Sequence, residues 1–364
     1  MEKTLSTVAP KKLELIQVFR GLASVAVLLT HCGLIFRQNF SRSFFNNAFN
    51  FGGAGVDFFF VLSGFIIFYI HAKDIGCPNK VKPFLIKRLI RIYPIYWVIL
   101  GLKIGSSWMA TYANGQSRNM VEILKAIVLF PQDRVVLSSS FLGVSWTLSF
   151  EIFFYLVFGL AILFPKRIMF PVIGLWLLGS FVNMVGLLPV DPEGLVSMFL
   201  FSPLNLEFAL GCSAAYLLRR YSFSQGQKIL TLGLFLLTIS IALDIYTDTH
   251  NLPSITQPWS ILPYGIPCWL LILGSVTLES EKVIQVSPWL SEIGNASYSI
   301  YLAHGFFINN LSRPLPKIYP PILDNAVLLN VSGIVISAAA LILGYGVYRY
   351  IENPMLGFCR RRFL

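Results

Sequence analysis

The sequence predicts an all-α integral membrane protein, a polytopic bundle of about ten transmembrane helices with both ends of the chain in the cytoplasm. Of its 364 residues, 55% are hydrophobic and only 12% are charged, whereas soluble globular chains carry about 25% charged residues. Apolar runs of about 20 residues, the length that crosses a bilayer, recur along the whole chain. A membrane β-barrel would instead show short alternating segments, so we expect helices.

The apolar runs divide the chain into expected membrane-spanning segments. A further segment at 120–130 is too short to span and carries Glu122 and Lys125, which predicts a helix at the membrane interface. No internal repeat, low-complexity linker or appended soluble domain is visible, so we expect one membrane domain over 1–364 with its core at 14–354. The expected spans lie at 16–35, 56–70, 92–110, 141–164, 168–188, 195–218, 229–246, 259–278, 293–311 and 326–351.

The distribution of basic residues predicts the orientation of these helices. Of the 28 Lys and Arg residues, 18 lie on the side of both termini and of the 73–91 connection, seven lie on the other side and three lie within spans. Positive charge accumulates on the cytoplasmic side, so we expect both termini in the cytoplasm and the protein in the inner membrane. The net charge of +11 indicates contact with anionic lipids and ligands, and nothing points to nucleic acid. The five scattered cysteines contain no C-x-x-C pair, so we expect no metal site.

Two ionisable residues share one face of the first expected helix. Arg20 and His31 are eleven positions apart, which is three helical turns, so both point the same way at a separation of about 16 Å along the axis. A charge at bilayer depth costs roughly 2.5–3.5 kcal/mol on insertion scales and persists where it is paired, hydrated or used. A snorkelling arginine and a packed histidine are the structural alternatives, and the alignment of the two residues favours function.

Asp57 opens the second expected helix, at the same depth as His31. One interpretation is that the carboxylate fixes the tautomer of the imidazole and strengthens it as a base. The other is that a first-turn aspartate offsets the helix dipole. The sequence leaves both interpretations open.

Three further ionisable residues fall within later spans. Glu151 follows Ser145 and Ser149 in the fourth span, where a functional or helix-bridging role is favoured over chance. Glu207 lies in mid-span and suits structural pairing equally well. His304 is either a second catalytic candidate or a packed histidine, and packing is the simpler interpretation.

The connection before the third span carries the densest basic cluster. Lys87, Arg88 and Arg91 lie within about one helical turn, and the last two, three positions apart, share a face. Paired arginines bind phosphate groups in a bidentate manner. The alternative is an ordinary cytoplasmic anchor, with the aromatic residues at 93–97 as an interfacial belt.

Taken together, these residues resemble the acyltransferase-3 family of integral membrane acyltransferases, over nearly the whole chain. Within that family, the segments 17–23 and 206–208 are most similar to the exopolysaccharide acetyltransferase branch. Each motif is weak alone, and six in the right order are specific. They are Arg20 with His31, Gly55 to Asp57 with Phe59 to Phe65, Arg88 and Arg91 with Tyr93 and Pro94, Ser145 to Glu151 (with Thr147 where the family has serine), Tyr298 to His304, and Glu352 with Pro354.

The resemblance implies an O-acyltransferase that uses acetyl-CoA, or another short acyl-CoA, as donor. The acceptor would be a hydroxyl of an exopolysaccharide, another cell-envelope glycan or a lipid-linked sugar, with no metal cofactor. Arg20, Arg88 and Arg91 would bind the donor, and His31 would act as the base, assisted by Asp57 or Glu151. Direct transfer and an acyl-enzyme route both remain open.

A proton-coupled transporter or flippase of a cell-envelope precursor is the alternative function. Intramembrane Arg, His, Asp and Glu residues also suit a proton relay. The chain shows neither an inverted repeat nor a pair of matched broken helices, which are typical of such transporters.

The asymmetry of basic residues predicts that a reporter fused after Leu364 lies in the cytoplasm. Fusions of alkaline phosphatase, active only outside the cytoplasm, and of β-galactosidase, active only inside it, measure this directly. Phosphatase activity of the Leu364 fusion would contradict the predicted orientation.

Overall fold

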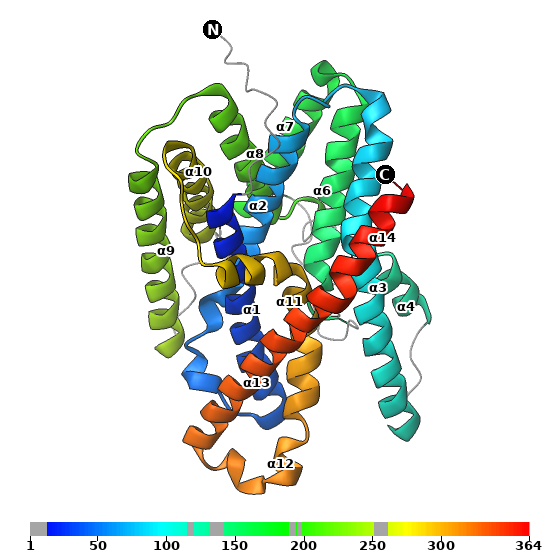
Figure 1. Cartoon of the computed structure of the whole chain (residues 1–364), viewed down its shortest axis with the longest axis vertical. Helices are drawn as coiled ribbons and strands as arrows, with labels where there is room; N and C mark the ends of the chain where they lie inside the picture. The colour runs from blue at the N-terminus through cyan, green and yellow to red at the C-terminus, as the bar shows by residue number, and fades with distance from the viewer. Residues whose placement is uncertain are drawn as a thin grey trace.

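A computed structural model describes residues 13–114, 120–131, 142–188, 194, 199–250 and 261–363. Every regular element in these ranges is helical, which confirms the predicted fold class. Figure 1 shows the helices as an elongated bundle. The helices are α1 (Glu14–Phe40), α2 (Ala54–His71), α3 (Val81–Asn114), α4 (Met120–Ile127), α6 (Ser145–Leu163), α7 (Lys166–Met184), α8 (Leu204–Arg220), α9 (Gly226–Thr249), α10 (Ile266–Glu281), α11 (Pro288–Ser312), α12 (Leu315–Ile318), α13 (Ala326–Val347) and α14 (Asn353–Phe363).

Seven helical stretches in the described residues are long and apolar enough to cross a membrane. The remaining three predicted spans fall on α3, α8 and α11, so the number ten stays a prediction. The helix α8 is only 17 residues long, and α11 buries Ser297, Ser299 and His304 inside the bundle. The predicted span at 326–351 coincides with α13 and the π-helical turn that follows it (Tyr348–Glu352), and the helix continues beyond the span into α14.

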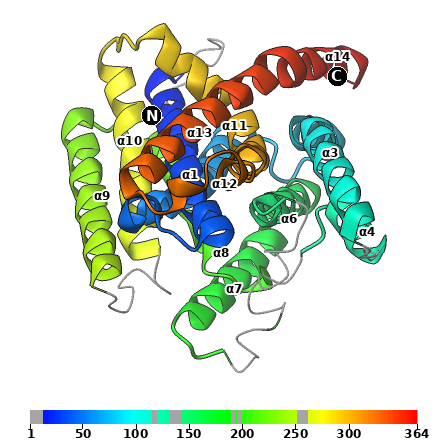
Figure 2. The ribbon, with the colours of Figure 1, turned by 90° about the horizontal axis from the view of Figure 1, so that it is seen from below.

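The ends of the helices agree with an alternating path through the membrane. The α2–α3, α6–α7 and α8–α9 connections and the end of α14 lie at one end of the long axis, and α12 lies at the other (Figure 1). Seen along that axis, α9 and α10 stand on one side of the bundle and α3 and α4 on the opposite side, with α1 and α11 between them (Figure 2). Which end faces the cytoplasm stays a prediction.

The two central helices, α1 and α11, run parallel and in register. A Cβ atom added to Gly294 would lie 2.1 Å from the Gln17 carbonyl oxygen, and one added to Gly21 would lie 3.2 Å from the Gly294 nitrogen. Farther along, the Asn39 amide donates to Asn309 Oδ1 at 3.2 Å. Small residues allow this close approach of helix backbones inside membranes.

The end of α10 holds the beginnings of two other helices. Glu279 accepts hydrogen bonds from the backbone nitrogens of Glu14 (3.1 Å) and Leu15 (2.6 Å). Glu281 accepts from the nitrogen of Gly226, which opens α9. These carboxylates satisfy amides that a helix leaves free at its N-terminus and complement its dipole. They therefore fix the start of α1, the helix that carries Arg20.

The aromatic residues after the basic cluster hold α4 in place. Tyr93, Tyr96 and Trp97 donate to the carbonyl oxygens of Val128, Ala126 and Ile127, at 3.0, 2.6 and 2.9 Å. These carbonyls lie at or just after the end of α4, where a helix has no acceptors paired within itself. The predicted short helix is thus present and is fastened to α3.

We expect Gly294→Ala to destabilise the protein, because the new methyl group meets the Gln17 backbone and overpacking costs typically 1–3 kcal/mol. Gly305→Ala on the same helix is the matched control. Its Cβ would meet nothing within 4 Å, and alanine favours a helix by about 1 kcal/mol over glycine. Thermal unfolding in detergent measures both variants. An unchanged midpoint for Gly294→Ala would contradict the tight α1–α11 contact.

Candidate functional site

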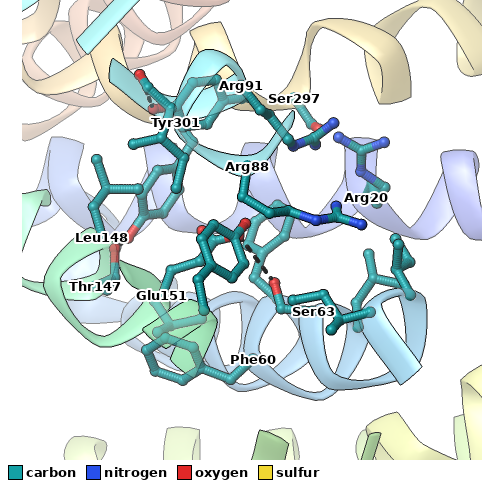
Figure 3. A pocket seen from close by; sticks show the side chains of 18 residues that line it. Arg20, Phe60, Ser63, Arg88, Arg91, Thr147, Leu148, Glu151, Ser297 and Tyr301 are labelled. Atoms are coloured by element: carbon teal, nitrogen blue, oxygen red, sulfur yellow. Dashed lines mark hydrogen bonds between the residues drawn. The ribbon is translucent and has the colours of Figure 1, made fainter. Parts of the chain in front are cut away.

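A cavity of about 890 Å³, which includes the space at its mouth, lies between α1, α2, α3, α6 and α11. Both polar and aromatic side chains line it (Figure 3). The lining residues are Arg20, Val56, Phe59, Phe60, Leu62, Ser63, Ile66, Ile67, Arg88, Arg91, Ile92, Thr147, Leu148, Glu151, Tyr155, Ser297, Tyr298 and Tyr301.

Three arginines from two helices converge on this cavity. Figure 3 shows the guanidinium groups of Arg20, Arg88 and Arg91 close to one another on one side of it. Arg88 and Arg91 project from the same face of α3, as their spacing predicted. Arg20 comes from α1, where its Nη1 donates to Gln17 Oε1 at 3.0 Å. Lys87 is exposed and does not line the cavity.

Two acidic side chains of the described residues offset part of this positive charge. Glu151 lies on the cavity wall, and Glu352, only 5% exposed, interacts electrostatically with Arg20. Glu352 is held by the Ser299 hydroxyl, which donates to it at 2.5 Å. Three arginines against two carboxylates leave one positive charge in excess, which favours an anionic ligand.

Two buried polar atoms on the cavity wall have no hydrogen-bond partner among the described residues, the Nε of Arg88 and the hydroxyl of Ser297. Ser297 is 0% exposed. A buried polar group left unpaired costs about 1–3 kcal/mol, and native structures hold few of them without a reason. Both atoms can donate, so a ligand with several acceptor oxygens would satisfy them.

Glu151 is oriented by two hydroxyl groups. Ser63 on α2 donates to Glu151 Oε1 at 3.3 Å, and Tyr155, one turn farther along α6, donates to the same oxygen. The ring of Tyr155 in turn lies under Arg88, whose guanidinium carbon is 5.9 Å from the ring centroid. The contacts of Glu151 therefore reach the arginine cluster through Tyr155.

His31 lies outside the lining of this cavity. Its Nδ1 is 2.9 Å from the Val27 carbonyl oxygen. Because a carbonyl only accepts hydrogen bonds, the neutral ring carries its proton on Nδ1 and keeps a lone pair on Nε2. The Val27 carbonyl thus sets the tautomer, the role that one interpretation of the sequence gave to Asp57.

Asp57 lies in the first turn of α2 and is 7% exposed. It interacts electrostatically with Tyr264 and Cys268, from the π-helical turn before α10 and from α10 itself. It does not line the cavity. Its position fits the first-turn interpretation, and its catalytic role stays a prediction.

The structure thus brings together four of the six predicted site residues and places the other two apart from them and from each other. Arg20, Arg88, Arg91 and Glu151 share one cavity, whereas His31 and Asp57 lie elsewhere. Sequence reasoning missed Ser297 and Tyr155, whose roles depend on which helices meet. A repeated spacing in the sequence could have indicated that His31 and His304 meet. His31 and His304 each follow a glycine by ten positions, Gly21 and Gly294 respectively, and those glycines are in contact.

Residues 14–349 match the family model described as an acyltransferase domain, from the first residue of α1 to the π-helical turn after α13. The chain belongs to this acyltransferase family. It is also similar to the exopolysaccharide production protein ExoZ of Rhizobium meliloti (strain 1021), with 29% identity over 321 residues that cover 86% of this chain and 92% of that protein. No solved structure matches the chain. The family resemblance inferred from the six motifs is confirmed, and the chain is a multi-pass membrane member of that family.

Proposed function

We propose that this protein transfers an acetyl or other short acyl group from acyl-CoA to a hydroxyl of an exopolysaccharide or of its lipid-linked precursor, in the inner membrane. Family membership supports acyl transfer, and the similarity to a protein of exopolysaccharide production supports the class of acceptor. The convergence of Arg20, Arg88 and Arg91 on one cavity is the main observation that supports acyl-CoA as the donor.

Coenzyme A is a polyanion with a diphosphate and a 3′-phosphate. Phosphate groups accept paired hydrogen bonds from guanidinium forks, and the cavity offers three such forks with one positive charge in excess. The unpaired Nε of Arg88 and the hydroxyl of Ser297 add two donors. Arg88 and Arg91 project from the first half of α3, close to the basic connection that we expect in the cytoplasm, where acyl-CoA is found.

The reach of the donor matches the separation of the two groups on α1. Arg20 and His31 stand about 16 Å apart along one helix face, too far to act on the same atoms. The pantetheine arm of coenzyme A is long and thin and separates the phosphates from the thioester. With its phosphates at the arginines, the arm would follow α1 and present the thioester near His31.

His31 has the tautomer that a general base requires. The lone pair on Nε2 takes the proton of the acceptor hydroxyl while the oxygen attacks the thioester carbonyl. The carbon–sulfur bond then breaks, and the thiolate of coenzyme A takes up the proton. The products are an O-acyl ester and free coenzyme A. Glu151 supports the donor site in this scheme, because its contacts hold Tyr155 beneath Arg88.

Arg88→Ala and Arg91→Ala are expected to weaken acyl-CoA binding about tenfold or more each, since a hydrogen bond to a charged group is worth about 1.5–3 kcal/mol. The neighbouring Lys87→Ala removes an equal charge outside the cavity and serves as the matched control. Equilibrium binding of acetyl-CoA to the purified variants measures the effect. Equal binding by all three variants would show that the cluster only anchors the protein.

His31→Gln should lower acyl transfer by about 10²–10⁴-fold, the usual contribution of a general base, while acyl-CoA still binds. Glutamine retains hydrogen-bonding groups but cannot take up the proton. Purified protein, radiolabelled acetyl-CoA and exopolysaccharide from a strain lacking this protein provide the assay. Transfer near the wild-type rate would remove His31 from the mechanism. An inactive wild-type protein that also fails to bind acetyl-CoA would refute the proposed function itself.

A further inference from the structure

A second histidine, His304 on α11, lies directly against His31. The two ring centroids are 4.8 Å apart and the ring planes meet at 59°. His304 is 0% exposed. Tyr301, one turn earlier on α11, lines the cavity and places its ring centroid 6.0 Å from that of His304. Tyr301 therefore connects the lining of the cavity with the pair of histidines.

The packing of α1 against α11 fixes this contact. His31 follows Gly21 by ten positions and His304 follows Gly294 by ten, a rise of about 15 Å along each parallel helix. Since the two glycines are in backbone contact, the two rings must arrive at the same level. The hydrogen bond from Asn39 to Asn309 closes the same interface farther along.

Both imidazoles have the same tautomer. His304 Nδ1 is 3.1 Å from the Ile300 carbonyl oxygen, as His31 Nδ1 is 2.9 Å from that of Val27. In each neutral ring the proton is therefore on Nδ1 and the lone pair is on Nε2. The Nε2 of His304 is buried and has no hydrogen-bond donor among the described residues. Such an acceptor is costly unless a donor reaches it during the working cycle.

We propose that His304 is a positioning residue that accepts a hydrogen bond from protonated His31, so that the two rings share the one proton that leaves the acceptor hydroxyl during acyl transfer. The inference rests on the proposed function, in which His31 is the base. As the acceptor oxygen bonds to the acyl carbon, its O–H bond breaks and the proton moves to Nε2 of His31. The new N–H then donates to Nε2 of His304. When the carbon–sulfur bond breaks, the thiolate takes the proton and both rings return to the neutral form.

A neutral acceptor suits this position better than a carboxylate does. An ionised aspartate inside the membrane would have to be desolvated throughout the cycle, whereas a second imidazole is uncharged until the proton arrives. The positive charge then spreads over a hydrogen-bonded pair of rings, which is favourable where the local dielectric constant is low. This arrangement explains how His31 can act without Asp57, which lies on the part of α2 that faces α10.

The test compares three variants of the full chain in the transfer assay described above. His304→Phe keeps a ring of similar size but removes the acceptor, and His304→Gln restores an acceptor oxygen. Leu302→Met is the control, a volume-conserving change at a position 1% exposed on the same helix. We expect kcat to fall about 10- to 100-fold in His304→Phe, the loss of a hydrogen bond to a charged group, with an unchanged KM for acetyl-CoA. His304→Gln should recover part of the loss, and Leu302→Met should match the wild type.

Several outcomes would overturn the inference. A wild-type kcat in His304→Phe would show that His304 does not accept a hydrogen bond from His31 during transfer. Equal losses of kcat in His304→Phe and His304→Gln, with equally lowered unfolding midpoints, would show that His304 contributes packing alone. A rise in KM for acetyl-CoA would assign His304 to donor binding instead. If His304→Phe does not fold, His304→Leu replaces it, because leucine also lacks an acceptor, and a wild-type kcat would again refute the proposal. An inactive wild-type protein would be a failure of the proposed function, not of the histidine pair.

Discussion

Where Gly21 of α1 meets Gly294 of α11, two helix backbones touch with no side chain between them. Inside a bilayer the hydrophobic effect does not hold helices together, because lipid tails are as apolar as leucine, so close packing has to do so. The two helices carry four of the residues that the proposed function uses: Arg20 and His31 on α1, and Ser297 and His304 on α11. If the helices were rotated or shifted against each other by one turn, the arginine cavity would lose one wall and the histidines would separate. The geometry of the site is therefore a consequence of the glycine contact.

Two helices of the bundle, α3 and α11, are unlike ordinary transmembrane segments because they carry polar residues. α3 and α11 carry arginines, serines and a histidine on faces turned into the bundle, where the polar groups meet one another or the cavity. Those groups lower the hydropathy of the helix without being exposed to lipid. Intramembrane ionisable residues face the interior of a bundle or a hydrated space for this reason. The lipid-facing helices α7 and α9, which bury little of their surface, are apolar on nearly every side.

Much of this architecture can be predicted from local sequence, and its failures have physical causes. The shared face of Arg88 and Arg91 follows from helix geometry, so a spacing of three positions was sufficient to predict it. The alignment of Arg20 with His31 follows in the same way. The pairing of His31 with His304 needs the register between two helices 273 positions apart in sequence, which no local period contains. The aromatic residues at 93–97 have the composition of an interfacial belt, but their composition does not show that they also donate to carbonyl oxygens at the end of α4, which a helix leaves unpaired. The predicted equal depth of Asp57 and His31 is wrong. The α2 helix runs antiparallel to α1, so the Phe58 ring lies 6.2 Å from that of Phe19, whereas Thr30, beside His31, donates to the carbonyl oxygen of Phe49, before α2 begins.

If Arg20 binds the donor and His31 acts as the base, as proposed above, their placement on a single uninterrupted helix makes α1 a molecular ruler. An α-helix barely stretches, so the distance between the group proposed to hold the donor's phosphates and the group proposed to act at its thioester would be constant. Such a ruler would select donors by the distance between their phosphates and their thioester and would not distinguish their acyl groups. A donor with a different distance between its phosphates and its thioester would be rejected, however well its acyl group fitted. Acetyl and longer acyl groups on coenzyme A would not be distinguished, because this distance is the same in all of them. Discrimination among acyl groups would then depend on the side chains around the thioester and not on this distance.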